Sequence, residues 1–318
     1  MKLSELVAYR NSLARYSVDA IKIEAEQQLA KIQYALEENS SIIDLKKYNL
    51  SKDLESINQG FANYNKTLER AQKEIQTKID KLEKSYFAES YRMYEEEMCF
   101  ETSEYILSRR MPMSPETQTL LESRVKSYSN WQYPGLIIRP GLEDFVTHMV
   151  DLDPLYLVDR DHELLLPSIS KFPIEYQRRL RYSYIKEQLD QPLLNAIPDN
   201  QIGVCLTFNF FEFKPFELLK QYLNEIYTKL RPGGILLMTY NDCDRSHCVA
   251  LVERNFTCYT PGGMVRKLAE TIGFEQVFHW NDFGNLTWLE LRKPGTLSTL
   301  RGGQTLAKIV HKPIAKSK

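Results

Sequence analysis

Four residues whose side chains can bind metals crowd into one short stretch: Cys243, His247, Cys248 and Cys258. Thiolates and imidazoles are ligands that zinc prefers, but structural zinc sites typically pair cysteines two to four residues apart, and this stretch has no C-x-x-C pair. We therefore interpret these thiols as buried or loop residues and predict no metal. The chain has five cysteines, an odd number without disulfide-framework spacing, which indicates a reducing compartment.

Acid–base and aromatic side chains gather at the ends of apolar runs. Asp242 and His279 are the candidate general bases, because each lies at or just after the end of such a run. Phenylalanine fills four of the six positions from Phe208 to Phe213. These rings could stack on a bound base or acceptor, or they could pack the next helix against a sheet, and the sequence leaves both interpretations open.

The elements that position these groups show most clearly between Lys229 and Tyr240, KLRPGGILLMTY. Arg231-Pro232-Gly233-Gly234 should stop the preceding helix, because proline cannot continue a helix and glycine supplies the positive φ of a reversal. The apolar run that follows suits a strand buried on both faces of a parallel sheet. Residues 264–280 repeat this logic with an amphipathic helix, a helix-ending Gly273 and an apolar strand.

The same patterns place further elements along residues 114–294. Strands are predicted at 135–139, 155–158, 181–185, 202–207, 235–240, 274–279 and 286–291, and helices at 142–150 and 215–230. Ser114-Pro115-Glu116 predicts a helix start, with serine as the cap and proline in the first helical position. Residues 281–285 predict a hairpin between the last two strands. Alternating strands and helices indicate a doubly wound α/β sheet that binds ligands at the carboxyl ends of its strands.

The order helix–Pro-Gly-Gly–strand, then helix–Gly-Phe–strand, closely resembles the C-terminal half of class I S-adenosylmethionine-dependent methyltransferases. The resemblance covers about residues 114–294 and implies a seven-stranded Rossmann-like sheet closed by an antiparallel edge. It also implies S-adenosylmethionine as cofactor and in-line displacement of its methyl group, with the protein mainly aligning the reactants. The Asn/Asp-Pro-Pro-aromatic motif of base-amino methyltransferases is missing after the fourth strand, so the resemblance leaves the acceptor unassigned.

The resemblance also assigns the cofactor loop, to the run from Arg139 to Glu143, RPGLE. Gly141 matches one glycine of the family's Gly-rich loop, whereas Arg139 and Glu143 stand where the family has two more. The Arg139 side chain would either occupy cofactor space or pair with the methionyl carboxylate.

Acidic and amide residues after the next strands complete the implied cofactor site. Asp159 matches the family's acidic residue that accepts hydrogen bonds from both ribose hydroxyls, with Asp161 as the second choice; a carboxylate there is also a common helix cap. Glu187 follows the third strand, where the family often contacts adenine, although a solvated glutamate is the simpler interpretation. Asn209, after the fourth strand, is the last cofactor-binding candidate.

Residues 1–97 are predicted to form an α-helical coiled-coil arm. From Leu50 to Ile75 apolar residues recur in alternating steps of four and three, which is a heptad seam that needs a partner. An earlier helix, Leu3 to Leu36, ends at Asn39-Ser40-Ser41. Two long helices bury little surface, so we expect either a hairpin that packs on itself or self-association and assembly through these helices.

The remaining segments are a linker at 98–113 and a basic tail at 295–318, and we interpret the tail as a solvated extension or a docking segment for an acidic partner. The net charge of −1 favours neither nucleic acid nor membrane. No run of about 18 apolar residues predicts a membrane span. The first residues lack the apolar core of a signal peptide, so we expect a cytoplasmic or virion protein.

Two functions follow, and the sequence leaves enzymatic activity open. One is a methyltransferase-like protein that uses S-adenosylmethionine and is carried on a helical oligomerisation arm. The other is a non-catalytic structural or docking component of a larger assembly, such as a viral particle, that retains the fold. Fold alone does not decide between them.

Overall fold

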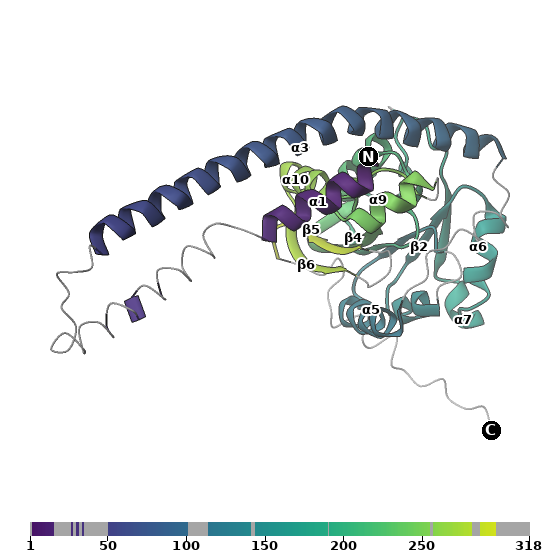
Figure 1. Ribbon diagram of the computed structural model, residues 1–318. Coiled ribbons are helices and arrows are strands. Elements are labelled where there is room, and N and C mark those ends of the chain that lie inside the picture. Colours follow the sequence, from purple (N-terminus) through teal and green to yellow (C-terminus); the bar gives the residue numbers. More distant parts are fainter. Residues whose placement is uncertain are drawn as a thin grey trace, which may run out of the picture. The chain divides into compact units, whose positions relative to one another are not determined.

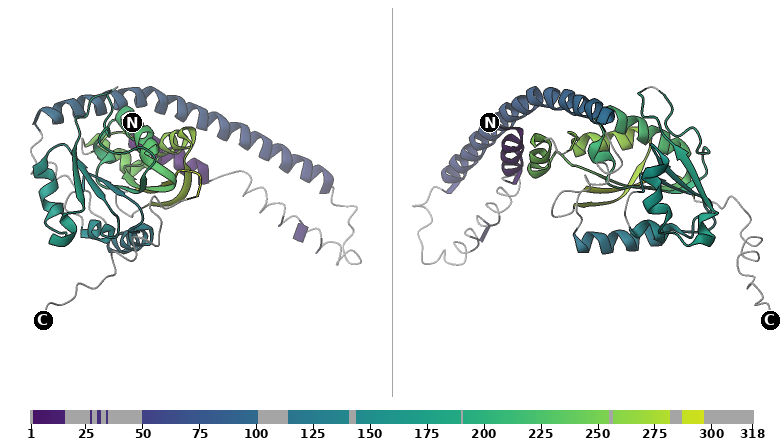
Figure 2. Two further views of the ribbon diagram at one scale, coloured as in Figure 1. Left: turned by 180° about the vertical axis from the view of Figure 1, so that it is seen from behind. Right: turned by 90° about the vertical axis from the view of Figure 1, so that its right-hand side faces the viewer.

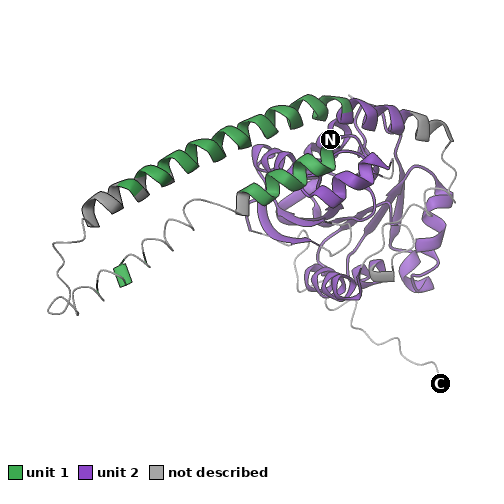
Figure 3. Cartoon of the chain, in the orientation of Figure 1, with its two compact units in different colours: residues 1–85 green, residues 86–318 purple. Residues whose placement is uncertain are grey.

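The computed structural model describes residues 2–15, 27, 30, 31, 34, 50–100, 114–140, 144–189, 191–254, 257–281 and 287–296. The chain divides into two compact units, Met1–Ser85 and Tyr86–Lys318, coloured green and purple in Figure 3. The boundary falls inside one long helix, so that helix contributes to both units. Within the described part of the chain, no helix is both long and apolar enough to cross a membrane.

Unit 1 contains helix α1 (Leu3–Arg15) and most of α3 (Leu50–Phe100), a helix of 51 residues. Its apolar residues are unequally covered: Ile75 and Ile79 are buried, whereas Tyr64 is 45% exposed. The second predicted helix of the arm is thus observed as one unbroken helix, while its coiled-coil pairing stays a prediction. The predicted break at 39–41 lies outside the described residues.

Unit 2 is built on one seven-stranded sheet, drawn in the lower half of Figure 1. Its strands are β1 (Gly135–Ile138), β2 (Leu155–Asp159), β3 (Leu180–Tyr184), β4 (Ile202–Thr207), β5 (Leu230–Tyr240), β6 (Glu275–Asn281) and β7 (Thr287–Arg292). The order is β3-β2-β1-β4-β5-β7-β6. The first five strands run parallel, and β7 pairs antiparallel with both β5 and β6. The predicted doubly wound sheet with an antiparallel edge is therefore confirmed.

Helices cover both faces of this sheet, as the right-hand view of Figure 2 shows. They are α5 (Pro115–Tyr128), η2 (Asp144–Met149), α6 (His162–Ile169), α7 (Ile174–Gln177), η3 (Phe211–Phe213), α8 (Phe216–Lys229), α9 (Ser246–Glu253) and α10 (Gly262–Ile272). One apolar core joins the sheet to α8 and α10, and the other joins it to α5, η2, α6 and α7. The central strands are accordingly buried along their whole length, as an apolar run between two helical layers requires.

Two helix ends confirm the predicted capping chemistry. The Ser114 side chain accepts a hydrogen bond from the Thr117 backbone N–H at 3.2 Å and so caps α5, with Pro115 in its first turn. Gly273 ends α10 in the left-handed region at φ 107°. A Cβ at Gly273 would lie 3.0 Å from the Tyr227 hydroxyl oxygen, so both conformation and space favour glycine.

Two predicted elements differ from the observed ones. The Pro-Gly-Gly run is not a turn between α8 and a strand: β5 begins at Leu230, directly after α8, and includes that run. The register against β4 shifts there, from Ile202 opposite Leu230 to Val204 opposite Ile235, so the extra residues form a bulge. The first predicted helix, at 142–150, is observed as the 3₁₀ helix η2, and residues 141–143 lie outside the described residues.

The last turns of α3 belong to unit 2 and pack beside the carboxyl ends of β4 and β5. The Phe87 ring lies 5.2 Å from that of Tyr259 and 6.1 Å from that of Phe216. The Ser90 hydroxyl accepts a hydrogen bond from the Tyr259 backbone N–H at 2.8 Å. This end of the helix therefore closes one side of the sheet edge at which an α/β fold binds its ligands.

Candidate functional site

The first feature of this edge is a buried ion pair between the ends of β1 and β2. The Arg139 Nε lies 3.4 Å from the Asp159 Oδ1, and both side chains are more than nine-tenths buried. Asp159 also accepts a hydrogen bond from the Arg160 backbone N–H at 2.7 Å. Burial raises the pKa of Asp159, and the Arg139 guanidinium opposes that rise. The residue predicted to hold the ribose thus has a cationic partner within the protein.

A second buried ion pair lies next to the first. The Lys214 ammonium contacts Glu187 Oε2, the Tyr222 hydroxyl donates to Glu187 Oε1 at 2.7 Å, and the Tyr94 hydroxyl donates to Oε2 at 2.8 Å. Burial by itself would raise the pKa of Glu187, but Lys214, Arg139 and these hydrogen bonds hold it below its ordinary value. The interpretation of Glu187 as a solvated glutamate is therefore wrong.

The Phe210 ring connects the two pairs. The Arg139 guanidinium carbon lies 5.2 Å from the centre of this ring, and the Lys214 ammonium lies 4.9 Å from it, which are cation–π distances. With Asp159 and Glu187 these residues form what we call the ion-pair cluster: Arg139, Asp159, Glu187, Phe210 and Lys214. Each cation has both a carboxylate and an aromatic face as partners, so the cluster is satisfied without a ligand.

The space left inside the ion-pair cluster tests whether S-adenosylmethionine fits. The cavity bounded by Ile138, Arg139, Asp159, Glu187, Phe210 and Tyr222 is about 10 Å³. That volume is about what a single water molecule needs, whereas pockets for cofactor-sized ligands are roughly 300–1,000 Å³. S-adenosylmethionine does not fit the site as these side chains are arranged. Of the two predictions for Arg139, the structure agrees with the one in which its side chain occupies the cofactor space.

The other predicted cofactor residues are scattered in role. Asp161 caps α6 by accepting a hydrogen bond from the Leu164 backbone N–H at 3.1 Å. Asn209 lies at φ 49°, and its backbone N–H donates to the Thr239 hydroxyl at 3.0 Å. Arg139 also has a positive φ, 52°, where the family has glycine, so its backbone takes the glycine conformation while adding a long side chain. Gly141 lies outside the described residues.

The candidate bases belong to a second polar cluster at the end of β5. Asp242 accepts hydrogen bonds from the backbone N–H groups of Gly262 and Asp244, both at 3.0 Å, and its Oδ2 lies 3.7 Å from Arg266. A Cβ at Gly262 would come within 2.5 Å of this carboxylate, so Asp242 is held against the start of α10. Burial lowers the pKa of His279, and Arg266 lowers it further. These contacts give Asp242 a structural role.

The aromatic run after β4 packs the following helix. Phe210 and Phe211 lie with ring centres 5.1 and 5.8 Å from that of Tyr222 on α8, and Phe208 lies 5.3 Å from Trp288. All four phenylalanines of the run are buried. The packing interpretation is therefore confirmed.

The thiols of the Cys/His stretch are also buried. Cys243, Cys248 and Cys258 are free cysteines, and burial raises the pKa of Cys248 to about 12 and that of Cys243 well above its ordinary value. Protonated, buried thiols are poor ligands and poor nucleophiles. The stretch therefore behaves as core, as predicted.

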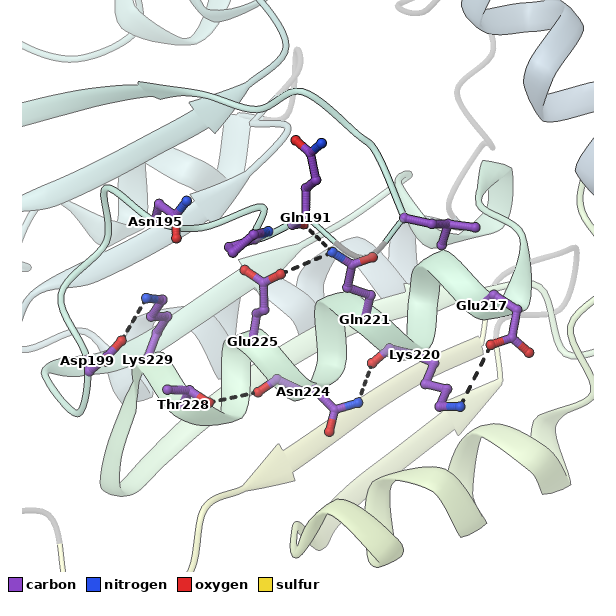
Figure 4. Close-up of a pocket in the computed structure, with 12 residues that line it drawn as sticks. Gln191, Asn195, Asp199, Glu217, Lys220, Gln221, Asn224, Glu225, Thr228 and Lys229 are labelled. Carbon is purple, nitrogen blue, oxygen red and sulfur yellow. Dashed lines mark hydrogen bonds and ion pairs between the residues drawn. The ribbon is translucent and has the colours of Figure 1, made fainter.

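A larger groove runs along α8, away from the ion-pair cluster (Figure 4). It has a volume of about 480 Å³ and is lined by residues 189–199 and 217–229. The Glu225 carboxylate accepts from the backbone N–H groups of Leu193 and Leu194, and Gln221 donates to the Gln191 carbonyl. These polar groups hold a loop against α8, so the groove is not a second cofactor site.

Strand order and direction decide the family resemblance. Five parallel strands with an antiparallel β7 inserted between β5 and β6 form the closing arrangement expected from the sequence. The chain resembles class I methyltransferases. No protein-family model matches the sequence, and no curated protein matches it.

Solved structures of similar fold include enzymes that differ in chemistry. An O-methyltransferase family protein from Burkholderia thailandensis is 11% identical, with a TM-score of 0.44 over 57% of this chain and 57% of that one. The N-methyltransferase NodS from Bradyrhizobium japonicum, solved with S-adenosyl-L-homocysteine, is 13% identical, with a TM-score of 0.43 over 64% and 98%. The [4+2]-cyclase SpnF is 12% identical, with a TM-score of 0.43 over 56% and 81%.

Three residues of the site were not predicted from the sequence: Tyr94, Lys214 and Tyr222. Lys214 follows the aromatic run, and Tyr222 lies one helical turn beyond the start of α8, so both are adjacent to predicted positions. A lysine inside a phenylalanine-rich run is the one signal of a buried, paired cation, because an unpaired ammonium there would be costly. Tyr94 reaches the site only because α3 extends into unit 2.

Proposed function

We propose that this chain is a non-catalytic structural or docking component that retains the methyltransferase fold and has filled its cofactor cleft with its own side chains. The observation that supports this proposal is the ion-pair cluster, whose residual cavity is about 10 Å³. The assembly role matches the helical arm, where Tyr64 is left largely exposed on a stripe of heptad spacing.

The energies of the competing contacts favour the closed cleft. A ribose that displaced Arg139 would supply Asp159 with hydrogen bonds to a charged group, each worth about 1.5–3 kcal/mol. Separating a buried ion pair costs about 3–5 kcal/mol, because it leaves a charge without its counter-charge. Glu187 would have to rearrange as well, since it shares Arg139 and the Phe210 face with the first pair. Cofactor entry therefore costs more than the ribose contacts return.

Ligand-induced stabilisation tests the proposal. A ligand at 100 times its dissociation constant stabilises a folded protein by about 2.7 kcal/mol, which raises the melting temperature by several degrees. We expect S-adenosylmethionine and S-adenosylhomocysteine, each at about 1 mM, to leave the melting temperature of the full chain unchanged. A concentration-dependent rise with either compound would contradict the closed cleft.

Cofactor binding by an active methyltransferase is the second candidate, and one observation favours it. Asp159 Oδ2 is buried and has no hydrogen-bond partner among the described residues, so one lone-pair direction at the ribose position stays open. In that case Arg139 would move to the methionyl carboxylate, and Arg139→Ala would weaken a measurable affinity. The melting experiment separates the candidates, because only this one predicts a shift in the wild-type chain.

A further inference from the structure

The exposed edge of the sheet has a composition that its neighbours lack. β3 is the first strand in the sheet order, so among the described strands only β2 pairs with it. From Gln177 to Lys186, QRRLRYSYIK, the sequence has four basic residues and no acidic one. The residues that present this chemistry to solvent are Arg178, Arg181, Tyr182, Tyr184 and Lys186 with the neighbouring His162, and we call them the β3 edge surface.

Aromatic rings are the unusual part of the β3 edge surface. Tyr182 is 40% exposed and Tyr184 is 53% exposed. Positions two apart on a strand point to the same face and lie roughly 7 Å apart, so the two rings form a row along the edge. His162 lies at ring-centre distances of 5.8 Å from Tyr182 and 6.4 Å from Tyr184, and its Nδ1 is 3.2 Å from the Tyr184 hydroxyl. The rings are thus held in place before any partner arrives.

We propose that the β3 edge surface binds single-stranded nucleic acid. Tyr182 and Tyr184 would each stack on one base of an extended strand, and Arg178, Arg181 and Lys186 would contact its phosphates. Single-strand binding proteins combine these two elements, because every base offers a flat π-face and the backbone is uniformly anionic. The net charge of −1 does not oppose this local contact, since the cations are concentrated on one edge.

Other occupants of this edge fit its chemistry less well. Charged residues on an edge strand also prevent strand addition, but that protection needs no exposed tyrosines. Pairing with a second copy of β3 would set Arg and Lys side chains against like charges. An acidic peptide would use the cations and leave the row of rings without a function. A double helix keeps its bases stacked on one another, so the rings could not reach their faces.

Fluorescence anisotropy with a labelled oligothymidylate tests this proposal on the full chain. For a strand of about 12 nucleotides we expect saturable binding whose logarithm falls with the logarithm of salt concentration with a slope of about −2, from roughly three phosphate contacts. Tyr182→Ala with Tyr184→Ala should weaken binding by about tenfold or more, whereas Tyr182→Phe with Tyr184→Phe should retain it, because phenylalanine keeps the stacking face. Arg178→Glu with Lys186→Glu should weaken binding and flatten the salt dependence.

Matched variants control for fold and for other charges. Tyr64→Ala removes a tyrosine of similar exposure on α3, and Lys220→Glu reverses an exposed cation on α8. Both should bind like the wild type, and circular dichroism should show every variant folded. The tail at 295–318 stays intact throughout, so loss in the tyrosine pair cannot come from it.

Three results would overturn the proposal. The first is no binding by the wild type at low salt, and the second is equal affinity of the wild type and the alanine pair. The third is displacement of the oligonucleotide by polyglutamate at equal charge concentration with no effect of the tyrosine substitutions, which would assign the surface to an acidic protein.

Discussion

At the residue scale, the fate of the cofactor cleft depends on one substitution in the family pattern. Arg139 occupies a left-handed backbone position that glycine holds in the family, and its side chain reaches Asp159. A glycine there would leave the cleft open and Asp159 available. The arginine closes the cleft and neutralises the carboxylate, which in turn lets Glu187 and Lys214 become buried beside it.

The energy of the Arg139–Asp159 pair can be measured by a double-mutant cycle. Arg139→Met should lower the free energy of unfolding by about 3–5 kcal/mol, because Asp159 then loses its buried counter-charge. Adding Asp159→Asn should restore a large part of that loss, since the uncompensated charge disappears. Urea denaturation monitored by tryptophan fluorescence would give both values. A double variant no more stable than Arg139→Met would contradict the pairing.

Glu212 is a second buried carboxyl, on η3, and burial raises its pKa from 4.5 to about 7. A carboxyl with a raised pKa in the folded chain holds its proton more tightly there than in the unfolded chain. Its contribution to stability is therefore complete below about pH 4.5 and is lost as the pH rises through about 7.

Glu212→Gln should consequently change the pH dependence of stability. Compared with the wild type, the variant should be about equally stable near pH 5 and about 2–4 kcal/mol more stable at pH 8, because glutamine never ionises. Thermal denaturation at the two pH values would measure this difference. The exposed Glu217→Gln serves as control and should show no such change. An equal effect of Glu212→Gln at both pH values would refute the raised pKa.

At the element scale, glycine has opposite roles in two helices. Gly273 ends α10 at φ 107° with Tyr227 close by, whereas a Cβ at Gly60 within α3 would meet nothing within 4 Å. Gly273→Ala should therefore destabilise unit 2 by about 1–3 kcal/mol through backbone strain. Gly60→Ala should stabilise α3 by about 0.5–1 kcal/mol, because alanine loses less entropy in a helix.

Circular dichroism and thermal denaturation of the two glycine variants would check these signs. A rise in helicity is expected for Gly60→Ala and a fall in melting temperature for Gly273→Ala. Two changes of the same sign would show that the backbone conformations assigned to these glycines are wrong.

Elements were more predictable from the sequence than the site was. All seven strands lie within a few residues of their predicted positions, apart from the early start of β5, because apolar runs and turn residues are local signals. The cap at Ser114 and the end at Gly273 are local in the same way. The bulge at 231–234 was missed because a Pro-Gly-Gly run has the same composition in a turn and in a bulge.

The ion-pair cluster was only half predictable for a physical reason. Arg139 and Asp159 could be named from motif positions, but their pairing depends on residues 20 positions apart meeting across β1 and β2. Lys214 and Tyr94 come from η3's flank and from α3, and no spacing in the sequence links them to Glu187. Three-dimensional packing supplied that information.

At the scale of the whole molecule, the arm is the part that suggests assembly. Tyr64 is largely exposed and Leu68 is half-buried, one turn apart on the heptad stripe of α3. Covering a large apolar side chain is worth roughly 1.5–3 kcal/mol, so two such sites can decide whether an association forms. We expect the wild-type chain to self-associate and Tyr64→Asp with Leu68→Asp to reduce its mass in multi-angle light scattering. A monomeric wild type at high concentration would contradict self-association.

The central claim, that the chain keeps the methyltransferase fold with a closed cofactor cleft, is tested most directly by isothermal titration calorimetry. The full-length wild type would be titrated with S-adenosylhomocysteine and with S-adenosylmethionine at about pH 7.5. The ion-pair cluster predicts no saturable heat with either compound. A one-to-one isotherm for the wild type, weakened by Asp159→Ala, would contradict the claim and assign the cleft to a working cofactor site.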